Sequence, residues 1–531
     1  MRKKFFAGLD VSTQSCKLLV IDFDTEDVIF VDSVNYDQDL PRYGTKDGVV
    51  QGLEHGASES DPLMWIDAVN VVFNRLSSSG IPMDRILCIS VSGQQHGLVA
   101  LDTEGDLTRS RSKLWNDFST HEECRILTER VGGKEAMIRE VGNSQRTGYT
   151  AAKILHMLRH EPEIYQKTMT FLIVHNYINW YLTGGKEGGI RVMEPGDTSG
   201  TALWNPKTGQ WSKTVINALN PELISKLPAV KPADQSIGFI SRELADKYGF
   251  ISECKIDAGS GDNMYGAVGT GNVRPGMVTV SLGTSGTACS IMTEPFIDST
   301  GEIATYCDST GQYLSLLCVS NLANGYNQLL RQFGMTHKEF NTLIKTTKPG
   351  NSGKLLIPWY MGERTPDLPL ATPVYFGFGL EELTKENLAR AVLEGHILNL
   401  YEGFRRMPVK AAEIRLTGGL SRSEAWCQTI ADIFEVETVP AEGEGAALGA
   451  ALHAAWVWLK ENGNAISLQD IVNRFVTLDE THRRKPDPAA TEIHRIQKKL
   501  FQTLSVRLLM DNGEDPFTLR SSLSSLADKI K

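Results

Sequence analysis

Cysteine is scarce in this 531-residue chain, which has eight cysteines and no CxxC pair. Such sparse usage argues against a disulfide framework and against a cysteine-based zinc site, and it indicates a reducing compartment. Cys16 and Cys289 each lie in an apolar, strand-like run. We therefore expect both thiols to be buried.

Long apolar runs are also missing. The most apolar segment, AALGAALHAAWVWL at 446–459, contains His453 and is shorter than the roughly 20 residues that a membrane-spanning helix needs. The apolar run near the N-terminus, Phe5 to Leu9, is interrupted by Asp10 and is too short for a signal peptide. We expect a cytoplasmic protein without a membrane partner, in which 446–459 forms a buried helix.

The chain has no excess of basic residues, because 54 Lys and Arg stand against 64 Asp and Glu and the net charge is −10. The basic residues are scattered and form no stripe that could follow a phosphate backbone, so nucleic acid is not an expected partner. Apolar residues make up 41% of the chain, which is ordinary for a globular protein. The length allows about two to four domains, or two large ones.

Strand-like and helix-like patterns alternate near the N-terminus. Segment 60–76 has apolar residues at helical spacing, Asp61 can cap its start, and Pro62 suits the first turn. Four apolar runs with turn residues between them are typical of strands: 5–11, 16–22, 28–36 and 85–93. Strands interleaved with a helix predict an α/β sheet.

Two distant segments share one plan, a turn of small polar residues between two apolar strands. They are GLDVSTQSCKLLV at 8–20 and VSLGTSGTACSIM at 280–292. Their alignment pairs Asp10 with Ser281, and it pairs two turns: Ser12, Thr13 and Gln14 with Gly283, Thr284 and Ser285. Backbone N–H groups in such turns bind anions. Either these are unrelated hairpins, or they are two similar halves that each offer a turn to a polyphosphate.

A third small-residue turn lies in EIRLTGGLSRSEAWCQTIADIF at 413–434, where a strand pattern, Gly418-Gly419 and a helix pattern follow one another. Ser421 and Glu424 have the spacing of a capping box at the helix start. The glycines permit close approach of a backbone or a planar ring, although a plain strand-to-helix connection explains them equally well. Small residues also share one face of the predicted helix at 446–459, which favours close packing on another helix: Gly445, Ala446, Gly449 and Ala450.

Two polar clusters could carry chemistry. In GSGDNMYGAVGTG at 259–271, Asp262 and Asn263 follow a short strand in a glycine-rich turn, and α/β proteins bind ligands at strand ends. A purely structural turn is the alternative. In GQQHG at 93–97, amides and the imidazole of His96 follow an apolar strand and suit hydrogen bonding to several hydroxyls. A satisfied core histidine is the alternative there.

Together these motifs resemble the FGGY carbohydrate kinases, a family of the actin-like ATPase superfold. The matching residues run from GLDVSTQ near residue 8 to EGAALGAALHA near 454, and GQQHG resembles the turn of the xylulokinase members. GYTAAKI at 148–154 and NLARAVLEG at 387–395 match two signatures of the family. The resemblance implies an α/β fold of two actin-like (ribonuclease H-like) ATPase domains with a cleft between them.

We expect a domain at 1–270 that binds the sugar and supplies the catalytic base, and an ATP-binding domain at 271–531 with a C-terminal helical extension. The last residues, about 462–531, carry no motif and are predicted to form terminal helices. The resemblance implies ATP-dependent phosphorylation of D-xylulose to D-xylulose 5-phosphate. Another ketose such as ribulose, or a polyol, is the alternative substrate, and a non-catalytic sugar-sensing protein is the alternative class.

The resemblance also implies a role for each matched residue. Asp262 would be the general base, and Asp10 would hold Mg2+ through water. The sugar would be bound by Gln95, His96, Arg146, Asp262 and Asn263. ATP would be bound by Ser12, Thr13, Gln14, Gly283, Thr284, Ser285, Gly418, Gly419 and Ser423, the last three at the adenine and ribose. The expected partners are a ketose and ATP, and a homodimer is compatible with the sequence.

Overall fold

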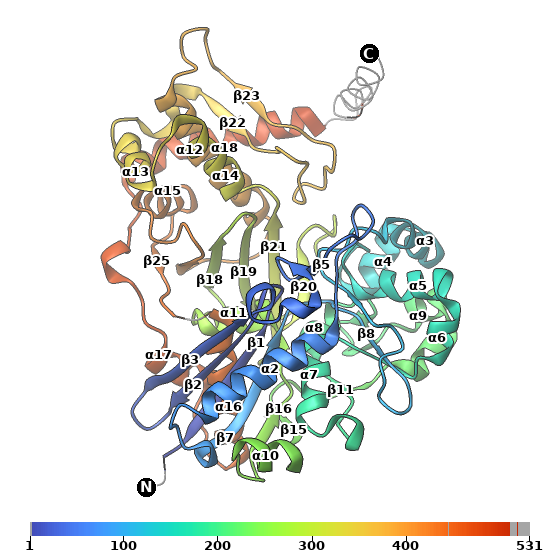
Figure 1. Cartoon of the computed structure of the whole chain (residues 1–531). Helices are drawn as coiled ribbons and strands as arrows, with labels where there is room; N and C mark the ends of the chain where they lie inside the picture. The colour runs from blue at the N-terminus through green and yellow to red at the C-terminus, as the bar shows by residue number, and fades with distance from the viewer. Residues whose placement is uncertain (1–2, 444, 510–517, 519–531) are drawn as a thin grey trace. The chain divides into compact units, whose positions relative to one another are not determined.

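Strands and helices alternate along the chain in the computed structural model, which describes residues 3–443, 445–509 and 518 (Figure 1). The chain divides into two units. The first comprises the chain up to Arg274 together with Ile291–Leu314 and Gly443–Val476, and the second comprises Pro275–Ser290, Ser315–Glu442 and the chain from Thr477 onward. The first unit is therefore built from three separate pieces of sequence.

A mixed sheet with the strand order β15-β16-β7-β1-β2-β3 forms the centre of the first unit, and β17 also pairs with β7. Strands β1, β2 and β3 form an antiparallel meander, whereas β7 runs parallel to β1 and to β16 and β17. The strands are β1 Phe5–Val11, β2 Ser15–Asp22, β3 Asp27–Asn35, β7 Ile86–Gly93, β15 Ser236–Phe239, β16 Lys255–Asp257 and β17 Ser260–Gly261. The four strands and the α/β sheet that the sequence predicts near the N-terminus are confirmed.

Helix α2, Pro62–Ser77, packs against β2 and β3, and Figure 1 shows it in blue beside the blue strands. The side chain of Asp61 accepts a hydrogen bond from the backbone N–H of Leu63, and Pro62 occupies the first helical position. Both features follow from helix geometry, since the first backbone N–H groups have no partner within the helix. The predicted helix and its cap are confirmed.

Helix α16, Gly445–Glu461, is the buried helix predicted from its apolar composition, and it packs on β1, β7 and helix α11, Asp262–Gly269. Glycines make this contact close, because a Cβ at Gly449 would collide with the carbonyl oxygen of Tyr265 and one at Gly269 with that of Gly445. The small-residue face therefore packs on another helix, as predicted.

The remaining elements of the first unit form smaller layers around the central sheet. Their helices are α3 His121–Val131, α4 Lys134–Val141, α5 Thr150–His160, α6 Pro162–Lys167, α7 Val174–Leu182, α8 Pro195–Ser199, α9 Lys213–Leu219, α10 Arg242–Tyr248 and α17 Leu468–Phe475. Among their short strands are β8 Val99–Leu101, β10 Thr170–Leu172 and β20 Ala304–Cys307. Buried side chains from α3, α4, α5 and α9 share one cluster with β8 and β10.

In the second unit, strands follow the order β21-β19-β18-β24-β25. Strands β18 and β19 form the predicted antiparallel hairpin, and β24 runs parallel to β18. The strands are β18 Met277–Leu282, β19 Gly286–Met292, β21 Tyr313–Val319, β24 Glu413–Thr417 and β25 Thr438–Pro440, with β22 Leu355–Ile357 and β23 Val374–Phe376 in a separate pair. The helices are α12 Ala323–Phe333, α13 His337–Lys345, α14 Lys385–Phe404, α15 Glu424–Phe434 and α18 Pro488–Leu509.

One local prediction is wrong, because segment 259–271 is largely a helix rather than a glycine-rich turn. Helix α11 begins at Asp262, and both Gly266 and Gly269 lie inside it. Glycine disfavours helices, but here the tight contact with α16 requires a glycine at position 269. Packing has therefore overridden local propensity.

The terminal helices predicted after residue 462 are present as α17 and α18, while residues 510–517 and 519–531 lie outside the described residues. The domain boundary at 270 stays a prediction. Across the described chain, no helix combines the length and the apolar character that crossing a membrane requires. Cys16 and Cys289 are both buried, as predicted.

Candidate active site

Three parallel strands of the first unit end at one edge of its sheet, and each delivers a predicted site residue there. In the pairing register, Asp10 of β1 lies opposite Ser92 of β7, which lies opposite Ser260 of β17. Neighbouring strands are about 4.8 Å apart. The chain continues from these strand ends into the Ser12–Gln14 turn, into GQQHG, and into Asp262.

Asp262 is half-buried at the first position of α11. Its Oδ1 accepts a hydrogen bond from Nδ2 of Asn263 at 3.1 Å. Burial, together with the negative charges of Asp10 and Asp197, raises the pKa of Asp262 to about 8, against the lowering effect of Asn263. In its ionised form, a carboxyl with such a pKa is a stronger proton acceptor than an ordinary aspartate, which suits a general base.

Gln95, His96 and Asn263 lie in one hydrogen-bonded group. Nδ2 of Asn263 donates to Oε1 of Gln95 at 2.6 Å, and Nε2 of Gln95 donates to Oδ1 of Asp197 at 3.3 Å. The backbone N–H of His96 donates to Oδ2 of Asp197 at 3.3 Å, and Nδ1 of its ring lies 3.2 Å from Oδ1 of the same carboxylate. The structure thus brings together three of the predicted sugar-binding residues, next to Asp262.

Asp197 is a residue that sequence reasoning missed. It lies in the short helix α8, Pro195–Ser199, and its side chain is completely buried. The side chain of Glu194 caps this helix by accepting from the backbone N–H groups of Gly196 and Asp197. The segment MEPGDTSG carries no periodic or glycine-loop signal of its own, so only the fold shows that this acid reaches His96.

Two residues of the GYTAAKI signature hold the backbone of the GQQHG turn. Nζ of Lys153 donates to the carbonyl oxygen of His96 at 2.6 Å, and Oγ1 of Thr150 donates to the same oxygen at 3.2 Å. His96 itself has a φ of +65°, a conformation that non-glycine residues rarely adopt. Burial lowers the pKa of Lys153 to about 7. The signature therefore stabilises a strained turn.

The guanidinium of Arg146 is hydrogen-bonded to two other residues of the first unit. It donates to the carbonyl oxygen of Gly301 at 2.9 Å and to Oγ of Ser144 at 3.3 Å. These bonds direct the guanidinium toward Gly301 in this structure. A sugar contact from Arg146 stays a prediction.

Asp10 lies at the edge between the first turn and the sheet. Oγ of Ser92 donates to its Oδ1 at 2.9 Å. Burial raises the pKa of Asp10 to about 6, while the hydrogen bond from Ser92 and the charge of Lys17 lower it. A nearby cation would offset the cost of keeping this carboxylate ionised.

In the second unit, the structure brings two predicted nucleotide-binding turns together. The Gly283–Ser285 turn joins β18 to β19, and the adjacent parallel strand β24 runs into Gly418-Gly419. Gly418 has a φ of +87°, and a Cβ there would lie 2.8 Å from the carbonyl oxygen of Leu282. Only glycine tolerates both the backbone conformation and this approach.

Ser423, and not Ser421, stands at the N-cap of α15, so the predicted capping box is wrong. Oγ of Ser423 donates to Oδ1 of Asn341 at 2.8 Å, and the same oxygen accepts from the backbone N–H of Ala425 at 2.9 Å. The amide of Asn341, from α13, therefore does the work of a capping side chain. A single sequence shows no local sign of this, because Asn341 is distant in the chain.

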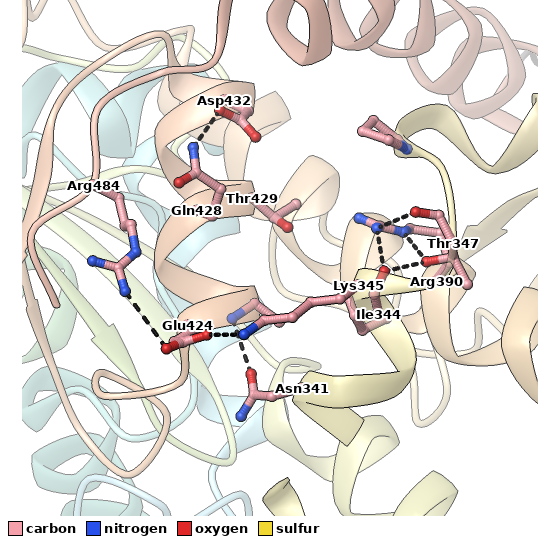
Figure 2. A pocket seen from close by; sticks show the side chains of 12 residues that line it. Asn341, Ile344, Lys345, Thr347, Arg390, Glu424, Gln428, Thr429, Asp432 and Arg484 are labelled. Atoms are coloured by element: carbon pink, nitrogen blue, oxygen red, sulfur yellow. Dashed lines mark hydrogen bonds and ion pairs between the residues drawn. The ribbon is translucent and has the colours of Figure 1, made fainter. Parts of the chain in front are cut away.

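A cavity of about 290 Å³ lies beside α15 in the second unit, and Asn341 and Glu424 are among its lining residues (Figure 2). Its charged side chains are already engaged with the protein. Lys345 pairs with Glu424 at 2.6 Å, and Arg390 donates to Thr347 and to the carbonyl oxygen of Ile344. The cavity adjoins the predicted adenine-binding Ser423 through Asn341.

The two sets of strand-end turns lie in two segments that match models of one protein family. Residues 5–269 match the N-terminal domain of the FGGY family of carbohydrate kinases, and residues 278–458 match its C-terminal domain. The architecture and the site thus define a carbohydrate kinase with the actin-like two-domain fold. The chain belongs to the FGGY family of carbohydrate kinases.

Several relatives of this chain have names that refer to one sugar. The xylulose kinase of Haemophilus influenzae is 34% identical over 493 residues, which cover 91% of this chain and 95% of that protein. A ligand-bound xylulose kinase from Lactobacillus acidophilus has a TM-score of 0.85 at 24% identity, covering 96% of this chain and 99% of that one. A gluconate kinase from the same organism gives the same values. Structural similarity at this level shows the fold but does not select a sugar.

Proposed function

We propose that this chain transfers the γ-phosphoryl group of ATP to D-xylulose and forms D-xylulose 5-phosphate. Family membership supports the reaction class, and the H. influenzae relative supports the sugar. The observation that carries the mechanism is Asp262, a half-buried carboxyl with a pKa of about 8 beside Gln95, His96 and Asn263. Another ketose or a polyol is the alternative substrate.

In this proposal, Asp262 accepts the proton of the C5 hydroxyl as that oxygen bonds to the γ-phosphorus. The bond between the γ-phosphorus and the β–γ bridging oxygen breaks, and ADP leaves. Phosphoryl transfer needs positioning and charge stabilisation more than covalent help from the protein. A positioned base contributes about 10²- to 10⁴-fold to the rate.

The hydroxyls of the sugar would form hydrogen bonds with the polar side chains around Asp197. Gln95 and Asn263 are fixed by their mutual hydrogen bond, and His96 is fixed at its backbone and near its ring by Asp197. Fixed polar side chains discriminate well between sugars, because a missing hydroxyl leaves a buried group unpaired. We include Arg146 among the sugar-binding residues on the resemblance alone.

Each unit carries turns that we propose as nucleotide-binding elements. We propose that Ser12, Thr13 and Gln14, with Gly283, Thr284 and Ser285, contact the phosphates through small-residue turns. We propose that Gly418, Gly419 and Ser423 line the adenine and ribose site. The contact between Gly418 and the backbone of Leu282 supports this grouping within the second unit.

Asp10 fits a magnesium ion held mainly by water and by phosphate. No group of three or more His, Cys, Asp or Glu side chains in the described part of the chain could hold a metal ion. Mg2+ commonly uses one or two carboxylates, with waters and substrate phosphates completing its octahedron. The raised pKa of Asp10 would fall beside such a cation. When bound, the ion would neutralise charge on the phosphates.

The test is a coupled ADP-release assay with D-xylulose, D-ribulose, L-ribulose, gluconate and glycerol at equal concentrations. We expect the highest kcat/KM with D-xylulose. Faster turnover of another compound would replace the substrate but keep the mechanism, whereas no sugar-dependent ADP release with any compound would contradict the function.

We further propose a cytoplasmic location and a homodimer. The eight cysteines are free, and seven of them are buried, which fits a reducing compartment. Light scattering of the purified chain measures the assembly directly, and a monomer mass at micromolar concentration would contradict the dimer.

A further inference from the structure

The two glutamines of the GQQHG turn point into different hydrogen-bonded groups. Gln94 is completely buried, and its side chain reaches the turn that follows β1. Its Nε2 donates to the carbonyl oxygen of Ser12 at 3.2 Å, and its Oε1 accepts from Oγ1 of Thr13 at 3.3 Å. Its backbone N–H donates to the carbonyl oxygen of Val11 at 2.9 Å. Gln94 thus makes three hydrogen bonds to three consecutive residues at the end of β1, Val11, Ser12 and Thr13.

Gln95, the next residue, is hydrogen-bonded instead to Asn263 and Asp197. It accepts from Asn263 at 2.6 Å and donates to Asp197 at 3.3 Å. Strand β7 ends at Gly93, and the two glutamine side chains diverge in the turn that follows it. The GQQHG turn therefore contacts the predicted phosphate-binding residues through Gln94 and the predicted sugar-binding residues through Gln95.

Trp115 holds Thr13 from another direction. The indole Nε1–H donates to Oγ1 of Thr13 at 2.9 Å, and Oγ1 donates onward to Gln94. A hydroxyl has a single hydrogen to donate, and that of Thr13 is directed at Gln94. A phosphate contact from Thr13 would then come from its backbone N–H, whose direction depends on how the turn is held.

Other groups hold the same turn at its carbonyl oxygens. The hydroxyl of Tyr36 donates to the carbonyl oxygen of Ser12 at 3.2 Å, alongside Gln94. Gly48 packs so closely on Thr13 that a Cβ there would collide with the carbonyl oxygen of Thr13. Carbonyl oxygens that are bound on one side orient the intervening N–H groups to the other side, which is the arrangement that binds anions.

We propose that Gln94 is a positioning residue for the ATP phosphates, and that GQQHG assigns its first glutamine to the nucleotide and its second to the sugar. The inference rests on the proposed function, in which Ser12–Gln14 contact phosphate. It extends that function to Gln94 and Trp115, which would act by holding the Ser12–Gln14 turn and not by touching a substrate.

The test separates the two substrates kinetically. Gln94→Met keeps the volume of the side chain but removes both polar atoms, and Gln95→Met is the matched control one residue away. We expect Gln94→Met to raise the KM for MgATP about 10-fold, as expected from one or two lost hydrogen bonds, with the sugar KM within about twofold of wild type. We expect the opposite pattern for Gln95→Met. Equal changes in both KM values, or a larger change in the sugar KM for Gln94→Met, would overturn the proposal.

Trp115→Phe provides a second variant, because Trp115 is 38% exposed and the replacement keeps an aromatic side chain while removing the donor to Thr13. We expect a smaller rise in the KM for MgATP. In a Thr13→Val background, Trp115→Phe should have no further effect, since the shared hydroxyl is gone. An undiminished effect of Trp115→Phe in that background would contradict the route through Thr13.

Calorimetric titration with MgATP in the absence of sugar distinguishes this inference from the proposed function. If wild type binds MgATP but phosphorylates no compound in the panel, the proposed function fails. Weaker MgATP binding by Gln94→Met would still support the inference, and unchanged binding would overturn it. A thermal melt of each variant reports whether it folds. If Gln94→Met does not fold, the MgATP binding of Trp115→Phe provides the test instead.

Discussion

Nδ1 of His96 lies 3.2 Å from Oδ1 of Asp197, a buried carboxylate that also binds Gln95 and the backbone of His96. A carboxylate at this distance favours the proton on Nδ1, which leaves Nε2 as an acceptor. His96 would then accept a hydrogen bond from a sugar hydroxyl rather than donate one. Asp197 thus holds two of the side chains that we propose bind the sugar, Gln95 and His96, from a position that need not touch the sugar.

Asp197→Asn should therefore weaken sugar binding with little effect on the nucleotide. Hydrogen bonds to a charged group contribute about 1.5–3 kcal/mol, so we expect the sugar KM to rise roughly 10- to 100-fold. Steady-state kinetics with each substrate varied in turn measure this. Asp106→Asn, on the exposed surface of the same unit, is the control. A sugar KM within twofold of wild type would show that Asp197 does not position His96.

Asp262→Asn should abolish most turnover while the protein still binds both substrates. The amide has nearly the shape of the carboxyl but cannot accept the hydroxyl proton, and a missing base costs about 10²- to 10⁴-fold in kcat. ADP release measures kcat, and calorimetric titration measures the Kd values for MgATP and sugar. A kcat within tenfold of wild type would show that another group accepts the proton.

The pH dependence of kcat/KM for the sugar should rise along an acid limb with a midpoint near 8. Asp262 must be ionised to act as a base, and burial together with Asp10 and Asp197 raises its pKa to about 8. Asp197→Asn removes one of these negative charges, so the midpoint should move to lower pH. A profile whose midpoint is the same in both proteins would separate Asp197 from the ionisation of Asp262.

Asp262→Asn should also stabilise the protein at alkaline pH. The folded state raises the pKa of Asp262 above its ordinary value of 3.8, so the native state binds more protons than the unfolded state between these values. The free energy of unfolding consequently falls as pH rises from about 4 through 8. Asparagine does not ionise. We therefore expect the Tm of Asp262→Asn to exceed that of wild type at pH 9, and the difference between the two Tm values to shrink toward pH 5. A Tm difference that grew on acidification would contradict this sign.

Gly449→Ala should destabilise the first unit, because its Cβ would collide with the carbonyl oxygen of Tyr265 in α11. Overpacking of this kind typically costs about 1–3 kcal/mol. Gly266→Ala is the matched control, since it lies within α11 with no heavy atom within 4 Å of the new Cβ. Alanine is the better helix former, so the control should leave Tm unchanged or raise it. Calorimetry measures both, and equal Tm values for the two variants would refute the close contact.

The sequence predicted those parts of the site that lie in short, self-contained patterns. The hairpins around Ser12–Gln14 and Gly283–Ser285 could be predicted because each combines two apolar strands with one polar turn. GQQHG and Asp262 could be predicted because both follow strands, and parallel strands deliver their ends to one edge of a sheet. The roles assigned to these residues came from the family resemblance.

The missing parts depend on long-range contacts that no local pattern shows. Asp197 meets His96 only after the fold brings α8 beside the GQQHG turn. Asn341 takes over the cap of α15 from another helix, which made the local capping box misleading. The helix at Asp262 was missed because its glycines favour a turn in isolation, whereas α16 requires one of them for packing.

Helix α16 covers β1 and β7, although it comes from Gly445–Glu461 and those strands end by Gly93. On a ribosome, the strands leave the exit tunnel long before their covering helix has been made. The nascent sheet must keep an apolar face exposed until α16 has been synthesised, and exposed apolar faces recruit chaperones or aggregate. Production of active protein should therefore depend on elongation rate and chaperone supply more than the stability of the finished fold suggests.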